Sequence, residues 1–295
     1  MGALLLNFSS ALKKHTQYVS ENFIDIDESE YLYHYTSTEN INNILNGEEL
    51  WVTHIKGLND MTEGVYVRTI VLEIINEFLE TTSLPKKHYQ GFIDVFNRGY
   101  DSAQPFSPYV LSLSKNKDSL NMWHSYTEIG SGVNIEFNYN EIIKDLMNFS
   151  IKEDELCIFG NCIYDKETQK EILRYPVQLF VDAVNNIWTN KDGHIYENQI
   201  EEALSFIQTF SVFIKNPSFV YEEEARIVFL GINEAKIKKH NKVSYNKPTN
   251  YIKIPFNSSS INSLLTSPST SSSIKIDNKK YGDLKIGKST IPMRY

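Results

Sequence analysis

The stretch YLYHYTSTENINNILNGEELW, from Tyr31 to Trp51, predicts a strand that is followed at once by a helix and a second strand. Its first six residues are rich in aromatic side chains, which is typical of a strand. Thr36 and Glu39 fit a capping box at the start of the helix, and Gly47 fits its end. His34 therefore lies where the first strand meets the helix. This position suits either a buried structural histidine or one wall of a pocket.

Helical and strand patterns alternate along the rest of the chain, and strands dominate its second half. Strand patterns are found at residues 50–55, 109–114, 133–137, 156–164, 222–230 and 250–256, and helical spacing at 3–19, 67–78 and 196–214. This order favours an α+β fold over a doubly wound sheet. Residues 1–30 are expected to form an N-terminal helical extension and an acidic linker, and residues 31–295 a single α+β domain. The serine-rich segment at 257–273 is interpreted as a loop or as two poorly packed segments.

The bulk composition is that of an ordinary globular chain. Of its 295 residues, 41% are apolar and 22% are charged, and no apolar run approaches the ~20 residues needed to cross a bilayer. Cys157 and Cys162 would alternate along a strand, so buried thiols are expected in place of a disulfide or a metal pair. The start of the chain lacks a basic leader, so the sequence predicts a cytoplasmic protein that does not enter a membrane. The net charge of −8 opposes an extended surface for nucleic acid.

Several common catalytic motifs do not occur in the sequence. It has no glycine-rich dinucleotide turn, no phosphate-binding loop, no paired-histidine zinc helix and no nucleophile elbow. Three short segments remain as candidates. They are His34-Tyr35-Thr36, the pair Ser112 and Ser114, and the stretch Glu222-x-Glu224-x-Arg226. If the last stretch is a strand, its three charged side chains share one face.

Each candidate also has a purely structural explanation. His34 taken alone suits a buried, hydrogen-bonded histidine, and the two serines suit a polar strand face. The run of three glutamates suits a solvated turn, with Arg226 as an ordinary ion-pair partner. Their order along the chain favours a functional site: a histidine in the first strand, hydroxyls in a middle strand, and a glutamate pair entering a late strand.

This order resembles the ADP-ribosyltransferase superfamily. The segment HYTSTENINNILNGEEL is similar in layout to the opening of the DNA-targeting ADP-ribosyltransferase toxins, with a histidine, a threonine, a short helix, a glycine and a leucine. More closely, residues 31–268 resemble a bacterial family known only as a domain of unknown function. The motifs of that family correspond here to His34-Tyr35-Thr36, Leu58-Asn59-Asp60, Ser112-Leu113-Ser114, Trp123, Tyr126, Gly132 and Glu222 to Arg226.

The resemblance implies an ADP-ribosyltransferase-like split β-sheet core with flanking helices, and NAD as a substrate without a metal. Glu224 would stabilise the ribosyl cation that develops as nicotinamide leaves. Glu222 would orient or deprotonate the acceptor. His34 would hydrogen-bond the adenosine-side ribose, and Ser112 or Ser114 would position the nicotinamide side or Glu224 itself.

Other residues are expected to contact the dinucleotide. An aromatic ring, that of Tyr35, Trp123 or Tyr126, would stack on the nicotinamide. Arg226 would pair either with Glu224 or with the pyrophosphate, because its planar fork of donors suits both. The remaining motif residues expected to bind the cofactor are Thr36, Asn59 and Asp60.

One departure leaves the subclass, and so the acceptor, open. Transferases that open with a histidine usually carry a tyrosine in the middle strand, where this chain has Ser112 and Ser114. Those that use serine usually open with an arginine and not with a residue such as His34. The acceptor is therefore a protein or a nucleic acid whose identity the sequence does not give.

Three functional classes stay open. The first is an NAD-consuming ADP-ribosyltransferase or NAD glycohydrolase that acts as a toxin or phage-defence effector, with an antitoxin or a defence-system protein as a candidate partner. The second is a non-catalytic nucleotide-binding or sensing module. The third is a glycosidase-like enzyme that acts on nucleic acid. The first and third predict that Glu224→Gln abolishes activity, whereas the second predicts changes in binding alone.

Overall fold

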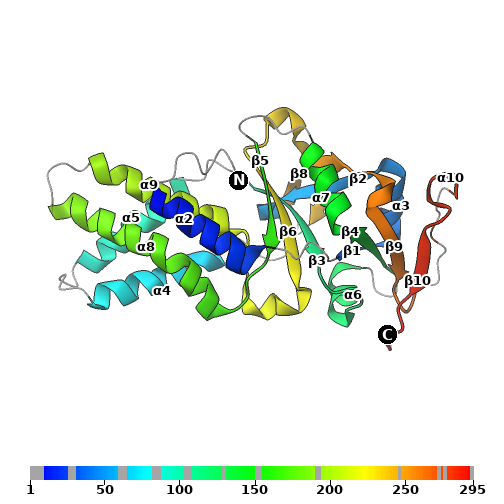
Figure 1. Cartoon of the computed structure of the whole chain (residues 1–295), viewed down its shortest axis with the longest axis horizontal. Helices are drawn as coiled ribbons and strands as arrows, with labels where there is room; N and C mark the ends of the chain where they lie inside the picture. The colour runs from blue at the N-terminus through cyan, green and yellow to red at the C-terminus, as the bar shows by residue number, and fades with distance from the viewer. Residues whose placement is uncertain are drawn as a thin grey trace.

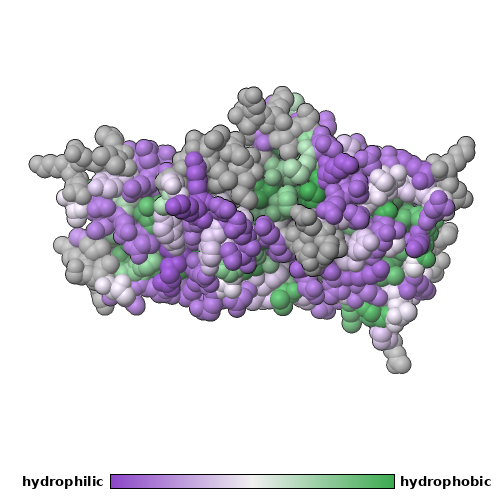
Figure 2. All heavy atoms as spheres, viewed as in Figure 1, coloured by the Kyte–Doolittle hydropathy of each residue, from purple (hydrophilic) through white to green (hydrophobic). Residues whose placement is uncertain are grey.

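A helical half and a sheet half lie end to end along the longest axis of the molecule (Figure 1). The computed structural model describes residues 10–25, 31–58, 65–81, 88–102, 108–127, 131–149, 155–189, 194–244, 247–270, 274 and 278–292. Polar side chains cover most of the face seen in Figure 2, and apolar side chains gather there in small patches. Among the described residues, no helix is both long enough and apolar enough to cross a membrane.

Within the described residues, the helical half contains five α-helices, which pack side by side (Figure 1). They are α2 (Ser10–Val19), α4 (Tyr66–Thr81), α5 (Tyr89–Ser102), α8 (Lys166–Thr189) and α9 (His194–Ser211). Buried aliphatic and aromatic side chains of α4, α5, α8 and α9 form one core. The sequence patterns predict no helix at α8, and Pro176 within it is a residue that normally ends a helix.

The N-terminal helix packs against this helical layer. His15 of α2 donates a hydrogen bond from Nε2 to the carbonyl of Ile172, 2.8 Å away, and its ring lies against Phe206. The single turn of π-helix that follows, η1 (Ser20–Ile24), adds Ile24 to an apolar cluster between the helices and the sheet. The described part of the predicted N-terminal helix therefore contacts the rest of the protein.

The sheet half is a mixed sheet that contains ten strands within the described residues. The strands are β1 (Tyr31–Thr36), β2 (Glu49–His54), β3 (Tyr109–Ser114), β4 (Val133–Asn138), β5 (Leu156–Asn161), β6 (Glu224–Leu230), β7 (Lys238–Ser244), β8 (Lys247–Pro255), β9 (Ile261–Thr266) and β10 (Lys285–Lys288). Their main order is β10-β9-β4-β1-β3-β2-β8-β7, while β6 pairs with both β3 and β5. Of the pairings between these strands, that of β9 with β10 is parallel and the others are antiparallel. The predicted α+β class with flanking helices is confirmed.

Helices α3 (Thr38–Gly47) and α7 (Tyr139–Asn148) pack on one face of the sheet. Strand alternation explains the two faces, because successive side chains of a strand point to opposite sides. In β3, Leu111 and Leu113 point into this core, whereas Ser112 and Ser114 point to the other side. The opposite face of β3 and β6 therefore carries polar side chains next to the helical half.

The serine-rich segment is more ordered than its composition indicates. Residues 258–260 form a turn of 3-10 helix, and residues 261–266 form β9 between β4 and β10. Ser260 is fully buried and donates a hydrogen bond to Asp145 of α7. Ile261 and Leu264 both reach the core because the β4–β9 register shifts between Glu136 and Phe137, which places one extra residue of β9 between them. The expectation of a loop or of poorly packed segments is therefore wrong for residues 258–266.

The turn from β1 into α3 differs from the expected capping box by one residue. Ser37, and not Thr36, caps the helix, and its hydroxyl accepts a hydrogen bond from the backbone N–H of Asn40. Thr36 remains the last residue of β1 and is buried. After α3 the chain reverses through Glu48, whose φ of 47° is in the left-handed region.

One edge of β3 is divided between two strands. The edge that faces β6 is paired along the whole strand, from Tyr109 to Ser114. On the other edge, β2 pairs with Tyr109 and Val110, whereas β1 pairs with Ser114. A strand has only two edges, so β1 and β2 separate from each other across residues 111–113 of β3. This separation opens the space in which the candidate site lies.

Candidate functional site

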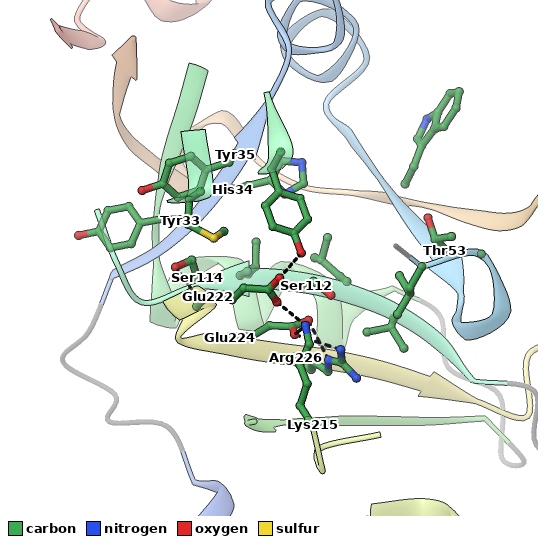
Figure 3. Close-up of a pocket in the computed structure, with 18 residues that line it drawn as sticks. Tyr33, His34, Tyr35, Thr53, Ser112, Ser114, Lys215, Glu222, Glu224 and Arg226 are labelled. Carbon is green, nitrogen blue, oxygen red and sulfur yellow. Dashed lines mark hydrogen bonds and ion pairs between the residues drawn. The ribbon is translucent and has the colours of Figure 1, made fainter. Parts of the chain in front are cut away.

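A cavity of about 230 Å³ lies where β1 and β2 separate (Figure 3). It is lined by residues of β1, β2, β3 and β6, of the short helix α6 (Leu120–Tyr126), and of the 3-10 helices η2 (Ile55–Gly57) and η4 (Pro217–Glu222) with the loop that precedes η4. The candidate residues that line it are His34, Tyr35, Ser112, Ser114, Tyr126, Glu222, Glu224 and Arg226. Segments almost 190 residues apart in the sequence are therefore brought to one place.

Two other candidates lie outside this lining. Thr36 is buried at the end of β1. Trp123 is buried in a small cluster with Tyr35, and the two rings pack edge-on with their centroids 4.8 Å apart. The indole Nε1–H of Trp123 donates to Asp118 at 2.7 Å. These contacts give both residues a structural role beside the cavity. Two further candidates, Asn59 and Asp60, lie outside the described residues.

The glutamate pair reaches the cavity by a different backbone path from the one expected. Glu222 is not part of the strand, because it ends η4. Glu223 then adopts a left-handed conformation with φ of 42°, and β6 begins at Glu224. The left-handed turn, and not strand alternation, directs Glu222 to the same side as Glu224 and Arg226. Figure 3 shows the three charged side chains together at the base of the cavity.

Glu224 is held by two cations. Arg226 donates from Nε to Oε1 at 2.8 Å and from Nη2 to Oε2 at 3.0 Å, and Lys215 donates from Nζ to Oε2 at 2.5 Å. Burial opposes ionisation of Glu224, but the charges of Arg226 and Lys215 outweigh it and lower the pKa of its carboxyl to about 2. Glu224 is therefore ionised at neutral pH although it is buried.

Glu222 lies in a different electrostatic environment. Its Oε1 accepts a hydrogen bond of 2.6 Å from the hydroxyl of Tyr126, and its Oε2 accepts one from Lys215. Burial raises the pKa of Glu222, and the nearby charge of Lys215 only partly offsets this effect. Two neighbouring carboxyl groups thus have pKa values displaced in opposite directions. Such pairs are found where one carboxyl stays ionised and the other takes up or releases protons.

The two serines have separate roles. Ser114 is buried, and its hydroxyl donates a hydrogen bond of 2.7 Å to the backbone carbonyl of Glu222. It therefore holds the turn that presents Glu222. Ser112 lines the cavity, and its backbone carbonyl accepts a hydrogen bond from the ring of His34. Burial lowers the pKa of His34 to about 4, so the ring is neutral at pH 7.

Arg226 and Tyr35 are occupied by contacts within the protein. Of the two partners predicted for Arg226, it binds Glu224, and its Nη1 also donates to the carbonyl of Val212 at 2.6 Å. The hydroxyl of Tyr35 donates to the carbonyl of Asn116 at 2.7 Å and accepts from the N–H of Ser119 at 3.1 Å. Both side chains therefore hold other parts of the site in place.

Lys215 is the main residue that the motifs do not reveal. It follows the apolar run VFI at 212–214 and is buried. The side-chain amide of Gln169, a buried residue of α8, donates to its backbone carbonyl at 2.8 Å. A lysine directly after an apolar run and before Asn-Pro is the one sequence signal of its burial. Its contact with two carboxylates appears only in the folded chain.

The described residues contain no group of three or more His, Cys, Asp or Glu side chains arranged to hold a metal ion. Cys157 and Cys162 are both free thiols. Burial raises the pKa of Cys157 to about 12, so it is a thiol and not a thiolate at neutral pH. The polar chemistry of the cavity therefore comes from carboxylate, ammonium, guanidinium, imidazole and hydroxyl groups.

The fold and the cavity define an α+β protein with a buried cluster of two carboxylates and two cations. Residues 122–227 match the model of a family described as Protein of unknown function (DUF2971). The match begins in α6 and ends in β6, so it includes Tyr126, Lys215 and both carboxylates of the cavity. His34 and the β3 serines lie outside it. No curated protein and no solved structure matches the chain.

Proposed function

We propose that this protein is an ADP-ribosyltransferase-like enzyme that cleaves NAD at the bond between nicotinamide and ribose. The observation that supports this most is the shared cavity of His34, Ser112 and the pair Glu222 and Glu224. The divided edge of β3 also supports it, because a sheet that separates between β1 and β2 fits the split core that the resemblance implies.

Glu224 suits the stabilisation of positive charge. When the bond from ribose C1′ to the nicotinamide nitrogen breaks, the electron pair leaves with the ring, which departs as a neutral molecule. The ribosyl group is left as an oxocarbenium-like cation. A carboxylate that is already ionised in a buried site stabilises such a cation without reorganisation. The low pKa of Glu224 provides this state at neutral pH.

Glu222 suits the second half of the reaction. A nucleophilic oxygen or nitrogen of the acceptor forms a bond to C1′ and must lose a proton. The raised pKa of Glu222 makes its carboxylate a better proton acceptor than an ordinary glutamate. If the acceptor is water, the products are ADP-ribose and nicotinamide. If it is a macromolecule, the product is an ADP-ribosylated protein or nucleic acid, as for a toxin or a phage-defence effector.

One observation favours a second candidate, a nucleotide-binding module without catalysis. Arg226 and Lys215 occupy both oxygens of Glu224, so the four charged side chains of the cluster balance to zero. A neutral cluster stabilises a ribosyl cation less than an unopposed carboxylate does. In this case NAD binds in the cavity and is not cleaved.

The test is to incubate the purified protein with NAD labelled in its adenylate part, alone and with a cell lysate. We expect release of nicotinamide and transfer of label to water or to a macromolecule. Glu224→Gln should lower the rate about 100-fold or more, as the loss of a preorganised electrostatic group does. Thermal melting of each variant shows whether the loss reflects chemistry or unfolding.

Glu223→Gln is the matched control. It changes the same functional group one residue earlier, and Glu223 is exposed and contacts Asn116 outside the cavity. Its rate should stay close to that of the unmodified protein. Equal rates for the unmodified protein and the folded Glu224→Gln variant would remove Glu224 from the mechanism. Binding of NAD without any nicotinamide release would favour the second candidate.

A further inference from the structure

An exposed tryptophan at the rim of the cavity stacks on a half-buried tyrosine. Trp51 of β2 lines the cavity and is 45% exposed, whereas its neighbours Leu50 and Val52 point into the sheet core. Its ring stacks on that of Tyr251 of β8, with centroids 4.4 Å apart and planes 21° from parallel. An indole supported from one side in this way is a flat, rigid surface at the edge of the site.

A lysine lies over the same indole ring. Lys253 is opposite Trp51 in the β2–β8 ladder, and its Nζ is 5.8 Å from the centre of the indole ring. Glu49 accepts a hydrogen bond from the same Nζ at 2.7 Å, which fixes the position of the amine. A positive charge next to an aromatic surface suits a ligand that carries both a ring and phosphate.

β3 positions several groups of the cavity relative to one another. At its C-terminal end, Ser114 lies opposite Glu224. Two residues earlier, the carbonyl of Ser112 accepts the hydrogen bond from His34. At its N-terminal end, Val110 lies opposite Thr53 of β2. Trp51 comes two residues before Thr53, in the part of β2 that has separated from β3, so its indole and the carboxylates are contributed by different walls of the cavity.

We propose that Trp51, supported by Tyr251, is the stacking platform for the purine base of a dinucleotide whose nicotinamide end lies at the two carboxylates. This rests on the proposed function and adds to it the position of the second base. The nicotinamide ribose would then lie at Glu224, the adenosine ribose at His34 and the base at Trp51, three residues that line one cavity.

The size of the cavity agrees with a base held at the rim. Ligand pockets commonly enclose roughly 300–1,000 Å³, and this cavity holds about 230 Å³. It encloses part of a dinucleotide and leaves the other part at its opening. A single-stranded nucleic acid also stacks on exposed aromatic rings, but its binding relies on basic surfaces. The net charge of −8 opposes this occupant.

The experiment measures binding of three probes to the full chain: AMP, ADP-ribose and nicotinamide mononucleotide. Trp51→Ala should weaken AMP and ADP-ribose binding about 5- to 150-fold, which is the range for loss of one base–aromatic stack. Trp51→Phe keeps an aromatic face and should retain most of the affinity, whereas Trp51→Leu should not. Nicotinamide mononucleotide carries no purine, so its affinity should be unchanged in all three variants.

Trp188→Ala is the matched control. Trp188 is also 45% exposed, and it packs edge-on against Phe92 in the helical half. Its replacement removes an equally exposed indole and should change none of the three affinities. Quenching of tryptophan fluorescence by AMP, present in the unmodified protein and lost in Trp51→Ala, gives a second readout.

Two results would overturn the platform. The first is that Trp51→Ala binds AMP and ADP-ribose with affinities within twofold of those of the unmodified protein. The other is that Trp51→Ala weakens binding of a single-stranded oligonucleotide but not of AMP. Failure of the proposed function is a separate result: no nicotinamide is released, yet AMP still binds in a manner that depends on Trp51. That outcome keeps the base site and removes the chemistry.

Discussion

The Nζ of Lys215 lies 2.5 Å from Oε2 of Glu224 and joins a loop that follows the helical half to the first residue of β6. Both side chains are at most 5% exposed. The same amine also donates to Glu222. This one cation therefore allows two buried carboxylates to lie side by side. Without it, their negative charges would repel each other.

Replacing Lys215 by methionine should strongly destabilise the fold. The change keeps most of the apolar stem but leaves two buried carboxylates with less compensation. Loss of one member of a buried ion pair costs about 3–5 kcal/mol. We expect a fall of this size in the free energy of unfolding, measured by denaturant titration. Adding Glu222→Gln should recover part of it, because one of the uncompensated charges is then removed.

The control for this prediction is Lys166→Met. Lys166 pairs with Glu73 at 2.9 Å, but the two side chains are 47% and 35% exposed. Exposed pairs contribute at most about 1 kcal/mol. If both lysine variants lose the same stability, the buried cluster does not hold the fold together.

The stability of the protein should depend on pH through His34. Its pKa is lowered from 6.5 to about 4 in the folded chain, mainly by burial. Between these values the unfolded chain binds more protons, so the contribution of His34 is complete above pH 6.5 and is lost as the pH falls toward 4. We expect the free energy of unfolding to fall by on the order of 2 kcal/mol, a figure that allows for partial exposure of the His34 ring.

The comparison is with His34→Gln, which keeps a side-chain N–H near the Ser112 carbonyl but does not titrate. Free energies of unfolding at pH 7.5 and pH 5 should differ less in this variant. Burial also lowers the pKa of His15 and His54, but these residues titrate in both proteins, so their effect cancels. The same difference in both proteins would show that the folded His34 titrates normally.

Tyr126→Phe should change the pH dependence of catalysis without removing either carboxylate. The Tyr126 hydroxyl donates to Glu222, and this bond lowers the pKa of Glu222. Without it the pKa rises further, so the acidic limb of the rate profile should move to higher pH. The measurement is nicotinamide release as a function of pH.

Tyr18→Phe provides a matched comparison. The Tyr18 hydroxyl makes a similar bond to Glu171, 2.8 Å long, on the exposed surface far from β6 in sequence. Its profile should coincide with that of the unmodified protein. An unshifted acidic limb in Tyr126→Phe would mean that ionisation of Glu222 does not control the rate.

Expression of the intact chain in bacteria should slow growth and lower cellular NAD if the proposed chemistry occurs. The Glu224→Gln form should have neither effect, because it lacks the carboxylate that stabilises the ribosyl cation. Glu223→Gln should be as harmful as the unmodified chain. Growth curves and NAD content at equal amounts of soluble protein provide the measurement. Equal growth with all forms would favour nucleotide binding without catalysis.

Local sequence patterns identify much of the fold. The alternation in YVLSLS predicts a strand at 109–114, and β3 occupies those residues, with Leu111 and Leu113 in the core and Ser112 on the other face. Such patterns are informative because the period of a strand or helix is set by its own backbone. Cap positions are less certain, as Ser37 in place of Thr36 shows.

Contacts between distant segments are decided by tertiary structure. The motifs point to His34, Ser112 and Glu224, but no local pattern places Lys215 between two carboxylates or Trp51 on the ring of Tyr251. These contacts depend on the order of the strands in the sheet and on where β1 and β2 separate along β3. Sequence alone therefore determined the types of element and the candidate chemical groups. The charge balance of the site and its open rim arise only when the sheet and the helical layer pack together.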